Sequence, residues 1–97
     1  MPTYIVLGQF TDQGIRNVKD TSKRADAAKE LAKKFGAKVL DLYWTMGRHD
    51  TVLIVEAPDD AAIAAFALSS GKLGNVRIET LRAFTQGEIN QILARVE

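Results

Sequence analysis

The chain contains no cysteine. Disulfide bonds, thiolate catalysis, and zinc or iron–sulfur sites with cysteine ligands are therefore excluded. Histidine is almost as scarce, since His49 is the only one among 97 residues. A dedicated transition-metal site is not expected from so few soft ligands. We expect neither a metal nor another cofactor.

Long apolar runs are also missing. No apolar segment approaches the roughly 20 residues that a membrane-spanning helix needs. The first ten residues, MPTYIVLGQF, lack the basic start and the long apolar stretch of a signal peptide. We therefore expect a cytoplasmic protein that has no membrane partner.

The chain has no large excess of charge of either sign. Its 13 basic and 12 acidic side chains leave a formal net charge of +1, which gives no overall attraction to nucleic acid. The basic residues gather in the first 38 positions, where interleaved acidic residues indicate a solvated helix face. No aromatic-rich stretch resembles an RNA-stacking strand. We expect no nucleic-acid partner.

What is present is the composition of an ordinary globular domain. Hydrophobic residues make up 46% of the chain and charged residues 26%. The length predicts a single domain over residues 1–97. A domain of this size buries only about 60–65% of its unfolded surface, so association with further copies would add useful burial.

Four segments have the short, β-branched and aromatic-rich composition of strands. They cover residues 3–10, 38–46, 51–57 and 76–84. The first and third are continuously apolar, from Tyr4 to Leu7 and from Val52 to Val55, which predicts burial on both faces. In the fourth, the apolar positions change parity after Ile78, which indicates a bulge or a change of packing partner.

The second predicted strand alternates cleanly. One face carries Leu40, Leu42, Trp44 and Met46, and the other carries Asp41, Tyr43 and Thr45. This pattern favours a core position for Trp44. Tyr43 is a candidate for a polar pocket, although an exposed position on an edge strand explains it equally well.

Helical patterns fill the spaces between these strands. One or two turns are expected within residues 11–20, and an amphipathic helix begins at the cap cluster 20–22 and ends at Gly36. A second helix covers the alanine-rich residues 61–70. A capping box, in which Thr85 is followed three residues later by Glu88, starts a C-terminal amphipathic helix.

The order β-α-β-β-α-β with a terminal helix predicts an α+β protein with a ferredoxin-like fold. Its two main helices cover one face of the sheet. The first and third strands are central in this fold, and they also carry apolar side chains on the other face, which must be covered. The C-terminal helix or a second subunit would cover it. We expect a homodimer or higher oligomer of the dimeric α/β-barrel type, packed sheet to sheet around a cavity.

The link between the second and third strands holds the most chemically capable residues. Gly47 suits a hairpin turn, and Arg48, His49 and Asp50 follow it. Histidine titrates near neutral pH as a residue type, so His49 is a candidate acid or base. Adjacent residues of an extended chain point in opposite directions, so His49 and Asp50 need not form a dyad. The alternative is a polar hairpin tip.

Two weaker motifs have simpler interpretations. Residues 69–75, SSGKLGN, lack the spacing of a phosphate-binding loop and follow a helix, so Gly71 is predicted to be a helix C-cap. Asp59 and Asp60 are predicted to cap the next helix rather than to bind a cation.

Three stretches, residues 4–27, 42–60 and 73–84, resemble the GYD-domain family, which is named for a glycine-tyrosine-aspartate motif. The motif falls on Gly47, His49 and Asp50, so histidine stands where the family name implies tyrosine. If the family uses a tyrosine hydroxyl for chemistry, His49 has to replace it. If the position needs only a planar hydrogen-bonding ring, histidine serves.

The resemblance implies a ferredoxin-like α+β fold similar to that of dimeric α/β-barrel proteins. It brings no activity with it. Some similar barrels are cofactor-independent monooxygenases or isomerases, but a shared fold does not imply a shared function.

Three functions therefore remain open. The first is a small-molecule-binding or sensing module, with polar contacts from Tyr43, Arg48, His49 and Asp50 near the mouth of a cavity on the sheet face. The second is a small cofactor-independent enzyme with His49 as acid or base. The third is a purely structural protein that serves assembly.

Overall fold

The computed structural model describes all 97 residues and contains one antiparallel sheet of four strands. The strands are β1 (Thr3–Phe10), β2 (Lys38–Trp44), β3 (Thr51–Glu56) and β4 (Val76–Ala83). Their spatial order is β2-β3-β1-β4. The two continuously apolar strands are therefore the central ones, as predicted.

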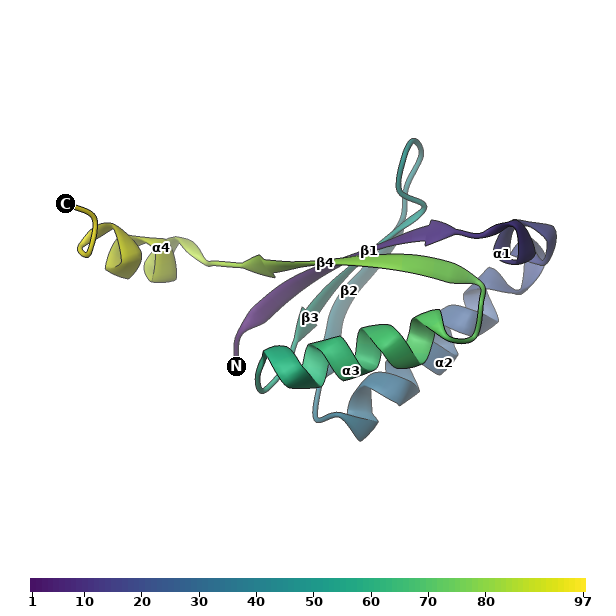
Figure 1. Ribbon diagram of the computed structural model, residues 1–97, viewed down its shortest axis with the longest axis horizontal. Helices are drawn as coiled ribbons and strands as arrows, with labels where there is room; N and C mark the ends of the chain where they lie inside the picture. Colours follow the sequence, from purple (N-terminus) through teal and green to yellow (C-terminus); the bar gives the residue numbers. More distant parts are fainter.

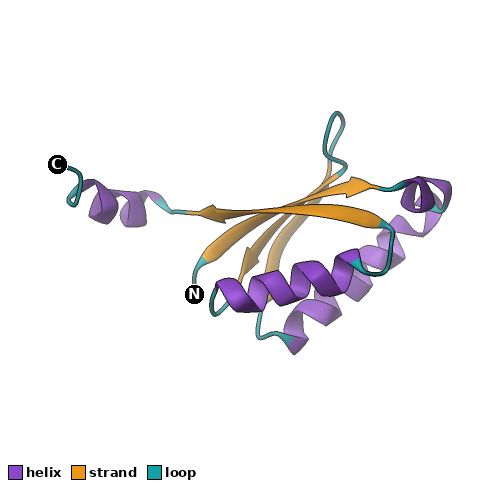
Figure 2. Ribbon diagram, viewed as in Figure 1, coloured by secondary structure: helices purple, strands orange, loops and turns teal.

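Helices precede and follow the strands along the chain. They are α1 (Asp12–Arg16), a 3₁₀ turn η1 (Val18–Asp20), α2 (Thr21–Lys34), α3 (Asp60–Gly71) and α4 (Gln86–Leu93). Both long helices, α2 and α3, lie on the same side of the sheet (Figure 1), and Figure 2 shows the resulting two layers. The fold is the small α+β arrangement that the element order predicts.

The core fills the space between the central strands and α3. Tyr4 and Val6 of β1 and Val55 of β3 are buried against Phe66 of α3. Alternate residues of each strand point to this side because the side-chain period of a strand is two. The Tyr4 hydroxyl donates a hydrogen bond to Asp60 Oδ1 at 2.5 Å. Burial, followed by this hydrogen bond, raises the pKa of Tyr4 to about 12.

Stability is expected to fall as pH rises from 10 towards 12, because the fold holds the neutral phenol and the unfolded chain ionises near pH 10. Below pH 10 this contribution is fully present. Urea unfolding at about pH 9 and about pH 11 measures the loss. Between these two pH values, the free energy of unfolding of Tyr4→Phe should fall less than that of the wild type. Tyr43→Phe, which changes the exposed tyrosine, should show the same decrease as the wild type. Equal losses in all three proteins would contradict this assignment.

The edge strand β2 differs from its predicted alternation. A register shift lies between Val39 and Asp41, so Val39 and Leu42 face the helices, while Leu40 is exposed. Met46 lies beyond the strand and is 99% exposed. The predicted four-residue apolar face is therefore wrong at two of its positions, because one extra residue changes the parity of an edge strand.

Trp44 does not occupy the predicted core position. It is on the helix side of the sheet but remains 46% exposed, because β2 is an edge strand and only the start of α2 lies beside it. Its indole N–H donates to Thr21 Oγ1 at 3.0 Å. The side chain thus links the end of β2 to the first residue of α2.

The parity change in β4 reflects a change of packing partner rather than a bulge. β4 pairs with β1 without a register shift. Ile78 packs against the core on the helix side, whereas Leu81 pairs with Ile5 on the opposite side.

The end of α3 differs from the prediction. The helix extends through Gly71, so Gly71 is not its C-cap. Lys72 is the cap residue, and Gly74, in the turn before β4, has the positive φ.

The C-terminal helix α4 extends away from the sheet beyond the end of β4 (Figure 1). It begins at a capping box, in which Thr85 Oγ1 accepts the Glu88 N–H and the Glu88 carboxylate accepts the Thr85 N–H. The backbone hydrogen bond from Thr85 lowers the pKa of Glu88. Ile89, Leu93 and Val96 are exposed along the helix and the last residues. In this arrangement α4 does not cover the face of the sheet opposite α2 and α3.

Candidate functional site on the open sheet face

The sheet face opposite α2 and α3 carries an apolar patch. In the register of the sheet, Ile5 lies between Ile54 and Leu81, and Leu7 lies beside Val52. Directly paired residues of antiparallel strands place their side chains on the same face. These five residues form what is called here the open-face patch, and no helix covers it (Figure 1).

The hairpin between β2 and β3 rises on this open side, opposite the two long helices (Figure 1). Its base is held by hydrogen bonds. The Asp50 N–H donates to the Gly8 carbonyl at 2.8 Å, and Asp50 Oδ2 accepts the Phe10 N–H at 2.8 Å. The Thr45 hydroxyl donates to the His49 carbonyl at 2.6 Å. Gly47 has a φ of 98°, as predicted for the turn. The hairpin is therefore fixed against the end of β1.

His49 reaches back from the hairpin across β1 towards β4. Its Nε2 lies 3.9 Å from Glu79 Oε2, which is longer than a hydrogen bond but close enough for an ion pair when the imidazole is protonated. The His49 side chain is 30% exposed and that of Glu79 is 62% exposed. Glu79 pairs with Leu7, so both groups lie at the margin of the open-face patch.

The other predicted site residues share this end of the sheet but have different surroundings. Tyr43 pairs with Val52 on the open face, on β2 rather than on the β4 side where His49 points. Arg48 is exposed at the hairpin tip. The Asp50 carboxylate is engaged by the main chain of β1. The structure thus brings His49 and Tyr43 to one face, on two sides of the patch, and their binding role stays a prediction.

Glu79 is absent from the sequence-based candidates. The sequence marks it only as a charge on an edge strand. Its place opposite Leu7 follows from the pairing of β4 with β1, which cannot be deduced from residue patterns alone. The parity that it shares with Leu81 was the one available signal, because residues two apart on a strand share a face.

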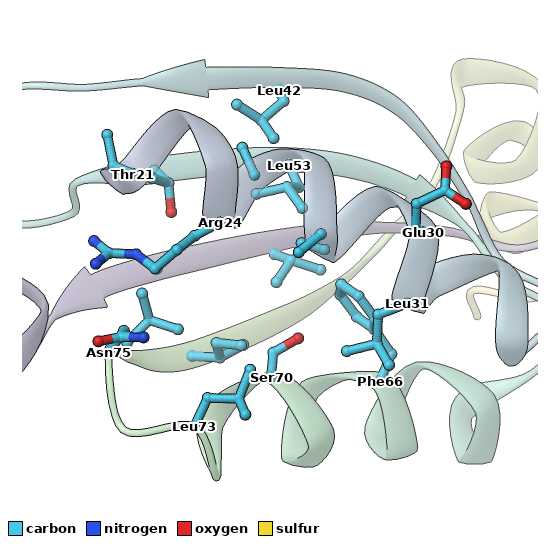
Figure 3. A pocket seen from close by; sticks show the side chains of 18 of the residues that line it. Thr21, Arg24, Glu30, Leu31, Leu42, Leu53, Phe66, Ser70, Leu73 and Asn75 are labelled. Carbon is cyan, nitrogen blue, oxygen red and sulfur yellow. The ribbon is translucent and has the colours of Figure 1, made fainter. Parts of the chain in front are cut away.

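Sequence reasoning also missed a cavity of about 440 Å³ on the helix side, between the sheet, α2 and α3 (Figure 3). Its apolar walls include Leu31, Leu42, Leu53 and Phe66. The side chains of Arg24, Ser70 and Asn75 contribute polar groups, and Trp44 lines the cavity too. The sequence pattern does not distinguish this cavity from a filled core.

The structure contains no group of three or more His, Cys, Asp or Glu side chains placed to hold a metal ion. Asp59 Oδ1 accepts the Ala62 N–H at 2.9 Å, so its predicted role as a helix cap is confirmed. None of the helices has both the length and the apolar character needed to span a bilayer.

A four-stranded antiparallel sheet, covered by two helices on one face and open on the other, defines a small ferredoxin-like α+β domain. The chain belongs to the GYD-domain family, whose model matches residues 4–93. The family resemblance seen in the sequence is thereby confirmed.

A curated relative and a solved structure, both from Thermus thermophilus, are similar to this chain. One, named glutamine synthetase and cystathionine beta-lyase binding protein, is 36% identical over 90 residues, which cover 92% of this chain and 95% of the relative. The other is the crystal structure of TTHA0845, with a TM-score of 0.57 and 25% identity, covering 88% of this chain and 95% of that one.

Proposed function

We propose that this GYD-domain protein is a homo-oligomeric binding module whose subunits associate through their open sheet faces and hold a small molecule between them. The observation that carries the proposal is the uncovered open-face patch. Contiguous apolar surface of this kind marks association or ligand sites in soluble domains. We keep the cytoplasm as the expected location of this module.

The hairpin residues would lie at the mouth of the enclosed space. Arg48 is exposed at the tip and is suited to bind a carboxylate or phosphate. His49 and Tyr43 would offer hydrogen bonds from two sides of the patch. Asp50 would act indirectly, because its carboxylate holds the hairpin against β1.

The enzyme alternative uses His49 as acid or base, with Tyr43 or Arg48 stabilising the developing charge. Arg48 is the chain neighbour of His49, whereas Tyr43 lies on the opposite side of the patch. A general acid or base needs a reacting atom within about 2.6–3.2 Å and a group that stabilises the developing charge beside it. The enzyme alternative would require turnover that disappears in His49→Ala.

Native mass spectrometry of the protein purified from its own host tests the proposed function. We expect a dimer or higher oligomer that retains a small molecule under gentle conditions and releases it on denaturation. His49→Ala should keep the subunit number and weaken the affinity for the ligand about tenfold, the contribution of one hydrogen bond, which lowers the fraction of oligomers that retain it.

Lys29→Ala, a change on the exposed side of α2, is the control and should alter neither quantity. A monomer with no added mass would contradict the proposal. An oligomer without a ligand would limit it to assembly.

A protein partner is a second candidate, favoured by the relative that is named as a binding protein for two enzymes. The exposed apolar residues Ile89, Leu93 and Val96 of the C-terminal segment would provide the contact surface. We expect purified glutamine synthetase from the organism that makes this protein to bind the full chain in biolayer interferometry. Leu93→Asp should weaken this binding about tenfold or more, since a buried leucine contributes about 1.5–3 kcal/mol.

Gln91→Asp adds the same charge to α4 outside the apolar positions and is the matched control. Equal weakening by both substitutions, or no binding by the wild type, would contradict this second candidate.

A further inference from the structure

The cavity on the helix side of the sheet exists because the side chains that line it are short. Ala25 and Ala28 of α2 face it, and Gly8 of β1 forms part of its floor. Farther along the layer, the space is closed by Phe66 of α3 and Leu31 of α2 (Figure 3). An amphipathic helix with alanine at its inward positions cannot fill the gap above a glycine. The result is a preformed space rather than a packed core.

The size and walls of the cavity suit a small molecule better than water. A volume of about 440 Å³ lies within the range of about 300–1,000 Å³ that small-molecule sites occupy. Apolar cavities hold water poorly, because each buried water needs two to four polar partners. The space is open to solvent on one side, where Trp44 and Leu73 of its lining are exposed. An apolar occupant would remove these apolar walls from water.

Two polar groups of the cavity have unused hydrogen-bonding capacity. The Ser70 hydroxyl is shielded from solvent and has no hydrogen-bond partner, and it points into the space between α3 and the sheet (Figure 3). Arg24 donates to the carbonyl groups of Asn17 and Gly14 at 3.1 and 3.2 Å, and it belongs to none of the salt bridges. A guanidinium has five N–H donors, so donors remain for a ligand.

The two ends of the cavity have different inward-facing side chains. Thr21, Arg24 and Asn75 lie at one end, and Leu31 and Phe66 lie at the other (Figure 3). Glu30 also lies beside Leu31, but its side chain is largely exposed and is paired with Lys33 at 3.0 Å. A ligand that matches this division has an acidic head and an apolar body. A carboxylate suits the Arg24 end because a guanidinium binds it with two parallel hydrogen bonds.

We propose that the space between α2, α3 and the sheet binds an amphipathic carboxylic acid, with its carboxylate at Arg24 and its apolar body directed towards Leu31 and Phe66. This site is distinct from the open-face patch and does not depend on its function. It lies on the other side of the sheet and requires no second subunit.

Trp44 provides a direct readout, because the only tryptophan of the chain lines this cavity. The full chain is stripped of bound molecules by unfolding and refolding, and decanoate is titrated below its micelle-forming concentration. Decanoate should change the Trp44 emission saturably and raise the thermal midpoint. Decanol and decylamine have matched chains with neutral and cationic heads. We expect decylamine to bind at least about tenfold more weakly than decanoate.

Arg24→Gln tests the head-group contact. It should weaken decanoate about tenfold and leave decanol unchanged. Lys29→Gln removes a positive charge from an exposed position of the same helix and should change neither affinity. Decanoate binding that is equal in Arg24→Gln and the wild type would overturn the assignment of the carboxylate to Arg24.

Ala28→Leu tests the cavity itself. The larger side chain should occupy the space, abolish binding of both decanoate and decanol, and leave the thermal midpoint equal or higher. Ala64→Leu adds the same atoms on the exposed side of α3 and should bind like the wild type. Three results would overturn the proposal: undiminished binding in Ala28→Leu, no preference for decanoate over decylamine, or α4 from another copy occupying the cavity in a structure of the refolded chain.

Discussion

Aspartate in place of Leu7 is expected to convert the proposed oligomer into monomers. Leu7 lies within the open-face patch, paired with Val52 on one side and Glu79 on the other. A carboxylate introduced there would be buried in the association surface next to the acidic Glu79. A buried charge without a partner costs about 3–5 kcal/mol, and a two-fold interface contains it twice. Sedimentation velocity over a range of protein concentrations should show a dissociation constant raised about a thousandfold or more.

The matched control is Leu68→Asp. Leu68 is 75% exposed on α3, on the other side of the sheet. Its substitution introduces the same charge at an apolar surface residue and should leave the subunit number unchanged. Circular dichroism of both variants establishes that the domain is folded. An oligomer that persists in Leu7→Asp would show that association uses another surface.

Alanine in place of Phe66 is expected to have the largest effect on stability. Phe66 is 1% exposed and packs against both the central strands and the helix layer. Truncation of a buried phenylalanine costs about 3–5 kcal/mol, and the total stability of a domain is about 5–15 kcal/mol. The loss should lie near the upper end, because the neighbouring alanines are too short to fill the new space. Urea unfolding measures the difference.

Leu73→Ala is the control for this stability measurement, because Leu73 also lines the helix-side cavity but is exposed. It should cost less than about 1 kcal/mol. A loss below about 2 kcal/mol in Phe66→Ala would mean that the helix layer collapses onto the vacated space. The cavity would then be a flexible gap and not a preformed site.

Much of the fold could be predicted from the sequence because its signals are local. The continuous apolar runs predicted β1 and β3 to be the central strands, and they are central, with apolar side chains on both faces. Asp59 caps α3 through the side-chain oxygen that accepts the Ala62 N–H, and Gly47 has a positive φ that favours glycine. The register shift in β2 had no such signal. Apolar residues stand at both parities around it, so a regular alternation fitted the sequence equally well.

Only those parts of the candidate site that are adjacent in the sequence could be predicted. Arg48, His49 and Asp50 share a hairpin, but the approach of His49 to Glu79 depends on which residue of β4 pairs with Leu7. The helix-side cavity could not be predicted for a different reason. Hydrophobic periodicity counts alanine as apolar, although its side chain is too small to fill the space it faces. Sequence patterns therefore indicate which side of a helix turns inward but not whether that side is filled.

The hydrogen bonds at the base of the hairpin bear on the histidine that stands where the family name implies tyrosine. Thr45 binds the main-chain carbonyl of residue 49, and the remaining bonds come from Asp50 and the backbone of β1. The side chain of His49 makes none of these hydrogen bonds; its one charged neighbour is Glu79 of β4, at 3.9 Å. We therefore expect tyrosine at position 49 to change what the loop recognises and to leave the position of the loop unchanged.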